Sequence, residues 1–264
     1  MRATSPAASE TLRPLVFVPG WVALAVAVVA VVLAGPSLPP VLQYVPLVAS
    51  ALVLGLPHGA VDHLEVARTR GLRPDLWAIG RVVALYAVVG GVYAVAWFLA
   101  PAAAFALFIL VTWFHWGQGD LYALVALAEA DHLRSRAQRL GTVVVRGGLP
   151  MLVPLLAFPE WYRRVATTLV GLFAPDAVAV LSPAFRPDVR LSLAIAYGAV
   201  VVGTLSVGYA RATDSAPWRL AAAETLGLVA YLALVPPVLA IGVYFCVWHS
   251  LRHIGRLLLV DDGA

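Results

Sequence analysis

The chain has 264 residues, of which 62% are hydrophobic and only 12% are charged. The charged share is about half that of an ordinary soluble domain, so the composition indicates an integral membrane protein. The formal net charge of +4 is small, and no basic cluster is interleaved with aromatic residues, which argues against a nucleic-acid partner.

Residue types that are absent or rare exclude further classes of protein. All basic residues are arginines, and the absence of lysine excludes a rhodopsin that holds retinal as a Schiff base. The single cysteine, Cys246, excludes an internal disulfide and a cysteine-rich metal site. Apolar segments recur to the C-terminus without a small-residue cleavage site, so we expect no signal peptide and a single membrane-embedded domain, 1–264.

Apolar runs of about 20 residues, the length that crosses a bilayer, follow a polar N-terminal tail, 1–16. Spans are predicted near 17–34, 41–61, 79–99, after Pro101, and near 140–157, 191–210, 219–235 and 238–259. Pro175 and Asp176 interrupt the run within 158–190, which we expect to be an interfacial or re-entrant connection. The predicted fold is all-α: a polytopic integral membrane helical bundle of about eight transmembrane helices, within a range of six to eight.

The distribution of arginines predicts how this bundle is oriented in the membrane. They gather in the tail and in the loops 62–78 and 128–139, whereas the intervening connections 35–40 and 100–102 have none. The positive-inside rule therefore predicts a multi-pass protein of the cell membrane with a cytoplasmic N-terminus. The connection 158–190 carries four arginines on the opposite side, although long connections follow the rule less closely.

Four histidines lie within or at the end of these apolar spans: His58, His115, His249 and His253. An imidazole in hydrocarbon is unfavourable unless a metal ion or a hydrogen-bond partner compensates it. The second, fourth and last predicted spans run in the same direction, which brings the four histidines to a similar depth. The pattern predicts one metal site, whereas His63 and His132 are expected at the interface or surface.

The first histidine lies at an irregular point of its helix. Pro57 interrupts the helix and Gly59 permits close backbone approach, so the His58 ring can be directed inward. Asp62, four residues further on, is a candidate acceptor for the ring nitrogen that a metal leaves unused. The alternative is a helix-end histidine that forms hydrogen bonds at the interface.

The second histidine, His115, is surrounded by aromatic residues and followed by two glycines, which let helices approach closely. Asp120 is either an acceptor for the histidine ring nitrogen that a metal leaves unused, like Asp62, or a solvated acid at a helix end. Aromatic residues near the histidines can line a slot for a flat, apolar ligand, although simple packing explains any one of them. The candidate slot residues are Trp113, Trp116, Tyr244, Phe245 and Trp248.

The last two histidines are four residues apart, which places His249 and His253 on one face of a helix, one turn apart. Such pairs recur in metal sites. Four imidazoles suit Fe(II), Zn(II) or Cu(II) by ligand type. A closed tetrahedral zinc site would be structural, whereas iron held by four histidines keeps open positions for oxygen chemistry.

Together the three segments resemble the Brp/Blh family of bacteriorhodopsin-related proteins, which are membrane-embedded β-carotene 15,15′-dioxygenases. The resemblance rests on Gly-Leu-Pro-His-Gly-Ala-Val-Asp at 55–62, Phe-His-Trp-Gly-Gln-Gly-Asp at 114–120 and Trp-His-Ser-Leu-Arg-His at 248–253. It implies a non-haem Fe(II) ligated by His58, His115, His249 and His253, and it assigns no ligand role to His63.

The same resemblance implies a reaction and its partners. With O₂ as co-substrate, β-carotene would be cleaved at its central double bond to two molecules of all-trans-retinal, which would supply a rhodopsin. Two other classes stay open: a membrane zinc hydrolase of the ceramidase/progestin-receptor type, and a non-enzymatic carotenoid carrier. A metal transporter is disfavoured because few acidic residues lie within the spans.

Overall fold

The computed structural model describes residues 6–35, 39–50, 52 and 76–261. In this part of the chain all regular elements are helices. The N-terminal half contains α1 (Pro6–Ala34), α2 (Pro40–Ala49), α5 (Leu76–Leu99) and α6 (Pro101–Ala126). The C-terminal half contains η3 (Asp131–Leu133), α7 (Arg136–Ala157), α8 (Pro159–Gly171), η4 (Pro175–Phe185), α9 (Pro187–Arg211), α10 (Ser215–Leu234), α11 (Pro237–Val243), η5 (Tyr244–His249) and α12 (Ser250–Asp261).

The predicted fold class, a polytopic helical membrane protein, is confirmed. Six helical segments of the described residues are long and apolar enough to cross a bilayer: Glu10–Ala34, Ile79–Leu99, Pro101–Ala126, Arg136–Ala157, Pro187–Arg211 and Pro237–Arg256. The α10 helix, which carries Arg219 and Glu224, is not among them. The predicted span 41–61 is helical to Ala49, and most of the rest lies outside the described residues.

Prolines and polar caps set many helix boundaries. The helices α6, α8, α9 and α11 each begin at a proline, whose missing N–H has no partner in a first turn anyway. Ser135 caps α7 by accepting a hydrogen bond from the Gln138 N–H at 3.2 Å. Asp214 caps α10 in the same way, through the Ala216 N–H at 2.9 Å. These caps place the short polar turns at the ends of the bundle.

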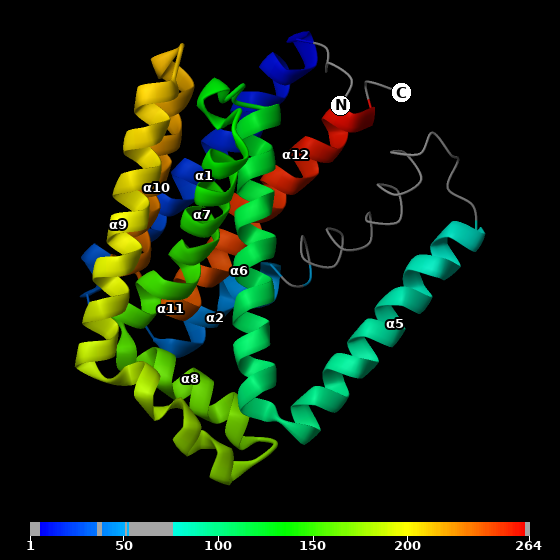
Figure 1. The fold of residues 1–264 in the computed structure, drawn as a ribbon, viewed down its shortest axis with the longest axis vertical. Helices are drawn as coiled ribbons and strands as arrows, with labels where there is room; N and C mark the ends of the chain where they lie inside the picture. Colours follow the sequence, from blue (N-terminus) through cyan, green and yellow to red (C-terminus); the bar gives the residue numbers. More distant parts are fainter. Residues whose placement is uncertain (1–5, 36–38, 51, 53–75, 262–264) are drawn as a thin grey trace.

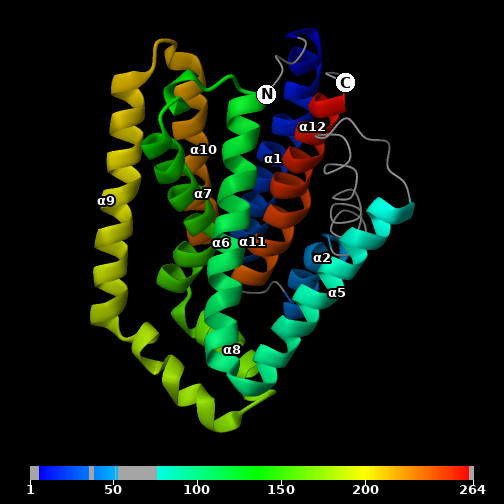
Figure 2. The same cartoon turned by 45° about the vertical axis from the view of Figure 1, so that its right-hand side comes forward.

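The helices form a bundle with α6 and α7 near its centre (Figures 1 and 2). In both views α9 and α10 lie on one side and α12 on the other, while α5 diverges from α6 away from their shared end. The α6 helix and the α11–η5–α12 segment run in the same direction, as predicted for the fourth and last spans. This parallel arrangement brings the histidines of the two segments toward one level.

Glycines allow α6 and α7 to pack backbone to backbone. A Cβ atom added at Gly117 would lie 2.1 Å from the carbonyl oxygen of Val143, and one at Gly147 would lie 1.8 Å from that of Trp113. No side chain fits at either position, because real Cβ atoms do not approach other atoms so closely. The contact of small residues fixes the separation of the two central helices.

The segment 158–190 folds as two short helices, α8 and η4, that cross one end of the bundle (Figure 1). The 13 residues of α8 are too few to span a bilayer. Whether this connection is interfacial or re-entrant stays a prediction. At the other end, α1 begins at Pro6, so residues 6–16 of the predicted polar tail are helical and continuous with the first span.

The expected surface position of His132 is wrong. Its side chain is only 4% exposed, because η3 folds back against α9 at Gly208, where a Cβ atom would lie 3.3 Å from the His132 ring. Burial lowers the pKa of His132 from its ordinary value, since desolvation disfavours the imidazolium form. A polar loop can thus bury one of its members when a glycine leaves room.

The neighbouring residue, Asp131, ties this turn to the start of α10. Its carboxylate accepts hydrogen bonds from the Thr213 hydroxyl, from the Thr213 N–H at 2.8 Å and from the Asp214 N–H at 3.2 Å. These bonds, the Thr213 hydroxyl foremost, favour the ionised form and lower the pKa of Asp131 from 3.8 to about 2.

Replacing Asp131 by Asn should remove an acid-sensitive part of the stability. A carboxylate with a lowered pKa stabilises the folded state above pH 3.8, and this contribution is lost as the pH falls toward about 2. In detergent, the melting temperature of the wild type should therefore exceed that of Asp131→Asn at neutral pH. The difference between the two melting temperatures should become smaller as the pH falls. Asp188→Asn, at an exposed carboxylate paired with Arg186, is the control. A gap that does not change with pH would contradict the assignment.

Candidate functional site

Two of the four predicted ligands meet inside the bundle. The Nε2 atom of His115 on α6 lies 3.3 Å from the Nε2 atom of His249 on η5, and the ring centroids are 5.1 Å apart. His249 is almost fully buried, at 1% exposed, whereas His115 lies at the surface of the described residues. The pair therefore spans the boundary between the core and the outer face of α6.

This separation fits two ligands of one metal ion. With metal–nitrogen distances of about 2.0–2.1 Å, two nitrogen atoms 3.3 Å apart subtend an angle of roughly 105–110° at the metal. The same distance also suits a hydrogen bond in which one protonated Nε2 donates to the other. The geometry is therefore compatible with a shared metal.

Of the other two predicted ligands, only His253 lies among the described residues. His253 is buried on α12, at 7% exposed. No group of three or more His, Cys, Asp or Glu side chains within the described residues is arranged to hold a metal ion. His58, Asp62 and His63 lie outside the residues that the structure describes. The four-histidine site thus stays a prediction, two members of which are in contact.

A glycine makes the approach of the two rings feasible. A Cβ atom added at Gly119 on α6 would lie 2.8 Å from Cε1 and 3.3 Å from Nδ1 of His249. Alanine at this position would push the imidazole away from α6 and from His115. The two glycines after His115 were predicted to allow close helix approach, and in the structure Gly119 makes room for the His249 ring.

His249 lies at the end of a π-helical turn, η5, inserted between α11 and α12. The Ser250 hydroxyl donates a hydrogen bond to the Phe245 carbonyl oxygen five residues earlier, at 2.8 Å. A π-helical turn alters the rotational phase of the side chains that follow it, and such turns are frequent at functional sites. The insertion could not be predicted from the apolar pattern, because the turn has the same composition as its neighbours.

Two of the predicted slot residues, Trp116 and Phe245, pack against His249, and a third, Tyr244, packs against Trp116. The Trp116 ring lies 5.1 Å from that of Tyr244, 6.2 Å from that of Phe245 and 5.9 Å from that of His249, between centroids. Phe245 is also stacked on His249 at 6.1 Å. This aromatic group, Trp116, Tyr244 and Phe245, covers one side of the imidazole with largely apolar surface.

The other two slot candidates are engaged elsewhere. The Trp113 indole N–H donates to the Val144 carbonyl oxygen at 2.9 Å, and its ring packs edge-on against Tyr197. Trp248 is fully buried and donates a hydrogen bond to Asp120 at 3.2 Å. Both indoles therefore have packing roles in the structure, and a contact with a ligand stays a prediction.

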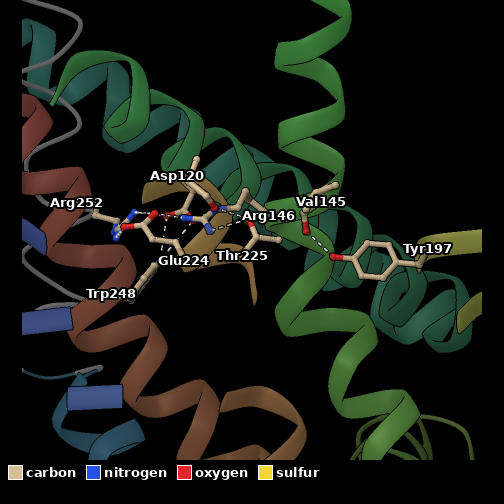
Figure 3. A network of polar contacts seen from close by, with 9 residues as sticks. Asp120, Val145, Arg146, Tyr197, Glu224, Thr225, Trp248 and Arg252 are labelled. Carbon is tan, nitrogen blue, oxygen red and sulfur yellow. Dashed lines mark hydrogen bonds and ion pairs between the residues drawn. The ribbon is translucent and has the colours of Figure 1, made fainter. Parts of the chain in front are cut away.

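Asp120 belongs to a network of four fully buried charges, shown in Figure 3. Its carboxylate lies 2.8 Å from Nε of Arg146 on α7 and 3.6 Å from a terminal nitrogen of Arg252 on α12. Glu224 on α10 pairs with the same two arginines. Asp120 is 0% exposed and is therefore not the solvated helix-end acid considered above; a direct role for it beside a histidine stays a prediction.

The network is electrically neutral, because two carboxylates face two guanidinium groups. Burying an unpaired charge costs several kcal/mol, so removal of any one member should be strongly destabilising. The roles of Arg146, Glu224 and Arg252 were not predicted from the sequence. The signal was an arginine or an acid within an apolar span, which by default marks a functional or pairing position.

Comparison with known proteins assigns the chain to a family. The family model for β-carotene 15,15′-dioxygenase matches residues 49–264. The chain belongs to the β-carotene 15,15′-dioxygenase family of enzymes. The probable β-carotene 15,15′-dioxygenase Blh of Halobacterium salinarum is 48% identical over 258 residues, which are 97% of this chain and 74% of that relative.

With more distant relatives in this family, the match covers a smaller share of the relative's length. The probable β-carotene 15,15′-dioxygenase Brp of Halobacterium salinarum is 38% identical over 81% of this chain, and the match spans 58% of Brp. A β-carotene 15,15′-dioxygenase of uncultured marine bacterium 66A03 is 23% identical over 78% of this chain and 66% of its own. No solved structure matches the chain significantly.

Gly119→Ala should separate His249 from His115 without unfolding the bundle. The added methyl group would displace the imidazole, so binding of Zn(II), used as a probe for paired imidazoles, should weaken by about 10–100-fold, as for other shifts of ligand orientation. Titration calorimetry on purified protein measures the effect. Gly198→Ala is the matched control, because a Cβ atom there meets nothing within 4 Å. Equal zinc affinity of the two variants would contradict this role.

Proposed function

We propose that this protein cleaves β-carotene at its central 15,15′ double bond to give two molecules of all-trans-retinal, with O₂ as co-substrate. The proposal assigns a non-haem Fe(II) to His58, His115, His249 and His253. The observation that carries it is the His115–His249 pair, at 3.3 Å between Nε2 atoms, in a chain of this enzyme family. A bound iron would supply activation of O₂, which the side chains themselves do not provide.

The overall reaction balances without a further reductant. The central carbon–carbon double bond of β-carotene is broken, two carbonyl groups form, and each takes one atom of the O₂ molecule. No proton needs to enter or leave. The protein therefore has to bind the polyene, orient it and exclude water from the site.

The aromatic group around His249 would orient the polyene. Trp116 and Phe245 are nearly parallel, with an angle of 27° between their rings, and Phe245 is half-buried. Flat rings of this kind pack well against a conjugated chain, and holding one double bond at a fixed place supplies much of the required rate. Because His115 lies at the outer face of α6, a lipid-soluble substrate could reach it from the bilayer.

The location and the use of the product follow from the same proposal. The start of α1 and the end of α12 lie at one end of the bundle (Figure 1), which we place in the cytoplasm by the arginine distribution. The protein would thus be a multi-pass component of the cell membrane. Retinal released into the bilayer would supply a rhodopsin, which this lysine-free chain cannot itself become.

Expression in cells that produce β-carotene tests the reaction. The wild-type protein should convert the pigment to retinal and should purify with iron. His249→Ala should lower the retinal yield and the iron affinity by roughly 100-fold or more, because a ligand is lost. His132→Ala, which removes a buried imidazole from η3, is the control and should retain both.

Three results would contradict the proposal. Persistence of β-carotene with iron and oxygen present would exclude the reaction. Stoichiometric zinc with activity that does not depend on oxygen would favour a membrane hydrolase instead. Carotene that is retained unchanged by the purified protein would favour a carrier.

A further inference from the structure

We infer that Glu224 is a positioning residue for the histidine site: through Arg252 and Arg146 it holds the segment that carries His249 and His253 against the helix that carries His115. The inference rests on the proposed function for its catalytic meaning. Glu224 lies on α10, which contributes no histidine, so it acts only through other residues.

Glu224 bridges the two arginines. Its Oε1 atom lies 2.5 Å from one terminal nitrogen of Arg252, and its Oε2 atom accepts a second hydrogen bond from Arg252 at 3.1 Å. The same Oε2 atom accepts a hydrogen bond from Arg146, which also donates a hydrogen bond to the Thr225 hydroxyl oxygen at 3.3 Å. Glu224 is 0% exposed and both arginines are 1% exposed. Both oxygens of the carboxylate are thus used, without competition from solvent.

The network ends one residue away from each histidine of the last segment. Arg252 directly precedes His253 and lies over the Trp248 ring at 3.8 Å. Trp248 directly precedes His249 and donates its indole N–H to Asp120. Asp120 belongs to α6, the helix of His115. A displacement of Arg252 is therefore transmitted over a few covalent and hydrogen-bonded links to the distance between His115 and His249.

Stability alone does not account for this arrangement. Apolar side chains of similar volume often stabilise a buried position as well as an ion pair does, and the best-attested benefit of buried polar groups is a fixed register. Each acid here contacts both arginines, so four helices, α6, α7, α10 and α12, are held in one relative position. That requirement suits a site whose ligand atoms must stay within a few tenths of an ångström.

The test compares Glu224→Gln with wild type by two measurements. In metal-free protein, carbethoxylation of histidines read by mass spectrometry should modify the exposed His115 and spare the buried His249 in wild type, whereas His249 should become reactive in Glu224→Gln. The dissociation constant for Fe(II) should rise by about 10–100-fold, as for other residues that orient metal ligands.

Two further variants separate positioning from stability. Glu224→Asp keeps the charge and should restore most of the His249 protection and the iron affinity. Val170→Ala creates a cavity in the separate apolar cluster around α8 and should lower the melting temperature while leaving both readouts unchanged.

The outcomes decide the two proposals independently. If Glu224→Gln keeps His249 protected, or if Val170→Ala exposes His249 equally, the positioning role is wrong. If wild type binds no iron and forms no retinal, the proposed function is wrong, while protection of His249 still decides the role of Glu224.

Discussion

Hydrocarbon does not solvate charged or hydrogen-bonding groups, and this constraint governs how the polar residues of the bundle are arranged. Asp120, Arg146, Glu224 and Arg252 are buried together, as two acids facing two bases. Each charge is tolerable only because its partners are present. The consequence is geometric as well as energetic, because four helices must adopt the one arrangement in which all the pairs form.

The second requirement is close approach. Gly117 and Gly147 bring the backbones of α6 and α7 together, and Gly119 leaves room for the His249 ring beside α6. The π-helical turn before α12 then sets the direction in which Trp248 and His249 point. Small residues and one irregular turn thus place the imidazoles, and the ionic network holds them there.

The sequence predicted the coarse features, because they depend on local patterns. Apolar runs located most helices, and the motif around His115 placed that residue on α6. Contacts between distant segments could not be predicted from one sequence: nothing local to Glu224 indicates Arg252, and nothing local to His132 indicates the space at Gly208. The contact between His115 and His249 was expected only from depth along parallel helices, and the π-helical turn that shapes it has no compositional signal.

Burial differs between the spans in a way that bears on the chemistry. In α7, which carries Arg146, 67% of the apolar window is buried, whereas in α5 the share is 0%. The charged network therefore lies on inner helices, where partners surround it, whereas the outer helix α5 carries Arg81 as its one charged residue. The His115–His249 pair lies between these zones, with one ring at the outer face of α6 and the other in the core. A site at this boundary can be held rigidly from the protein side while it remains open to a substrate that dissolves only in lipid, and a site in the charged centre or on α5 would meet only one of these requirements.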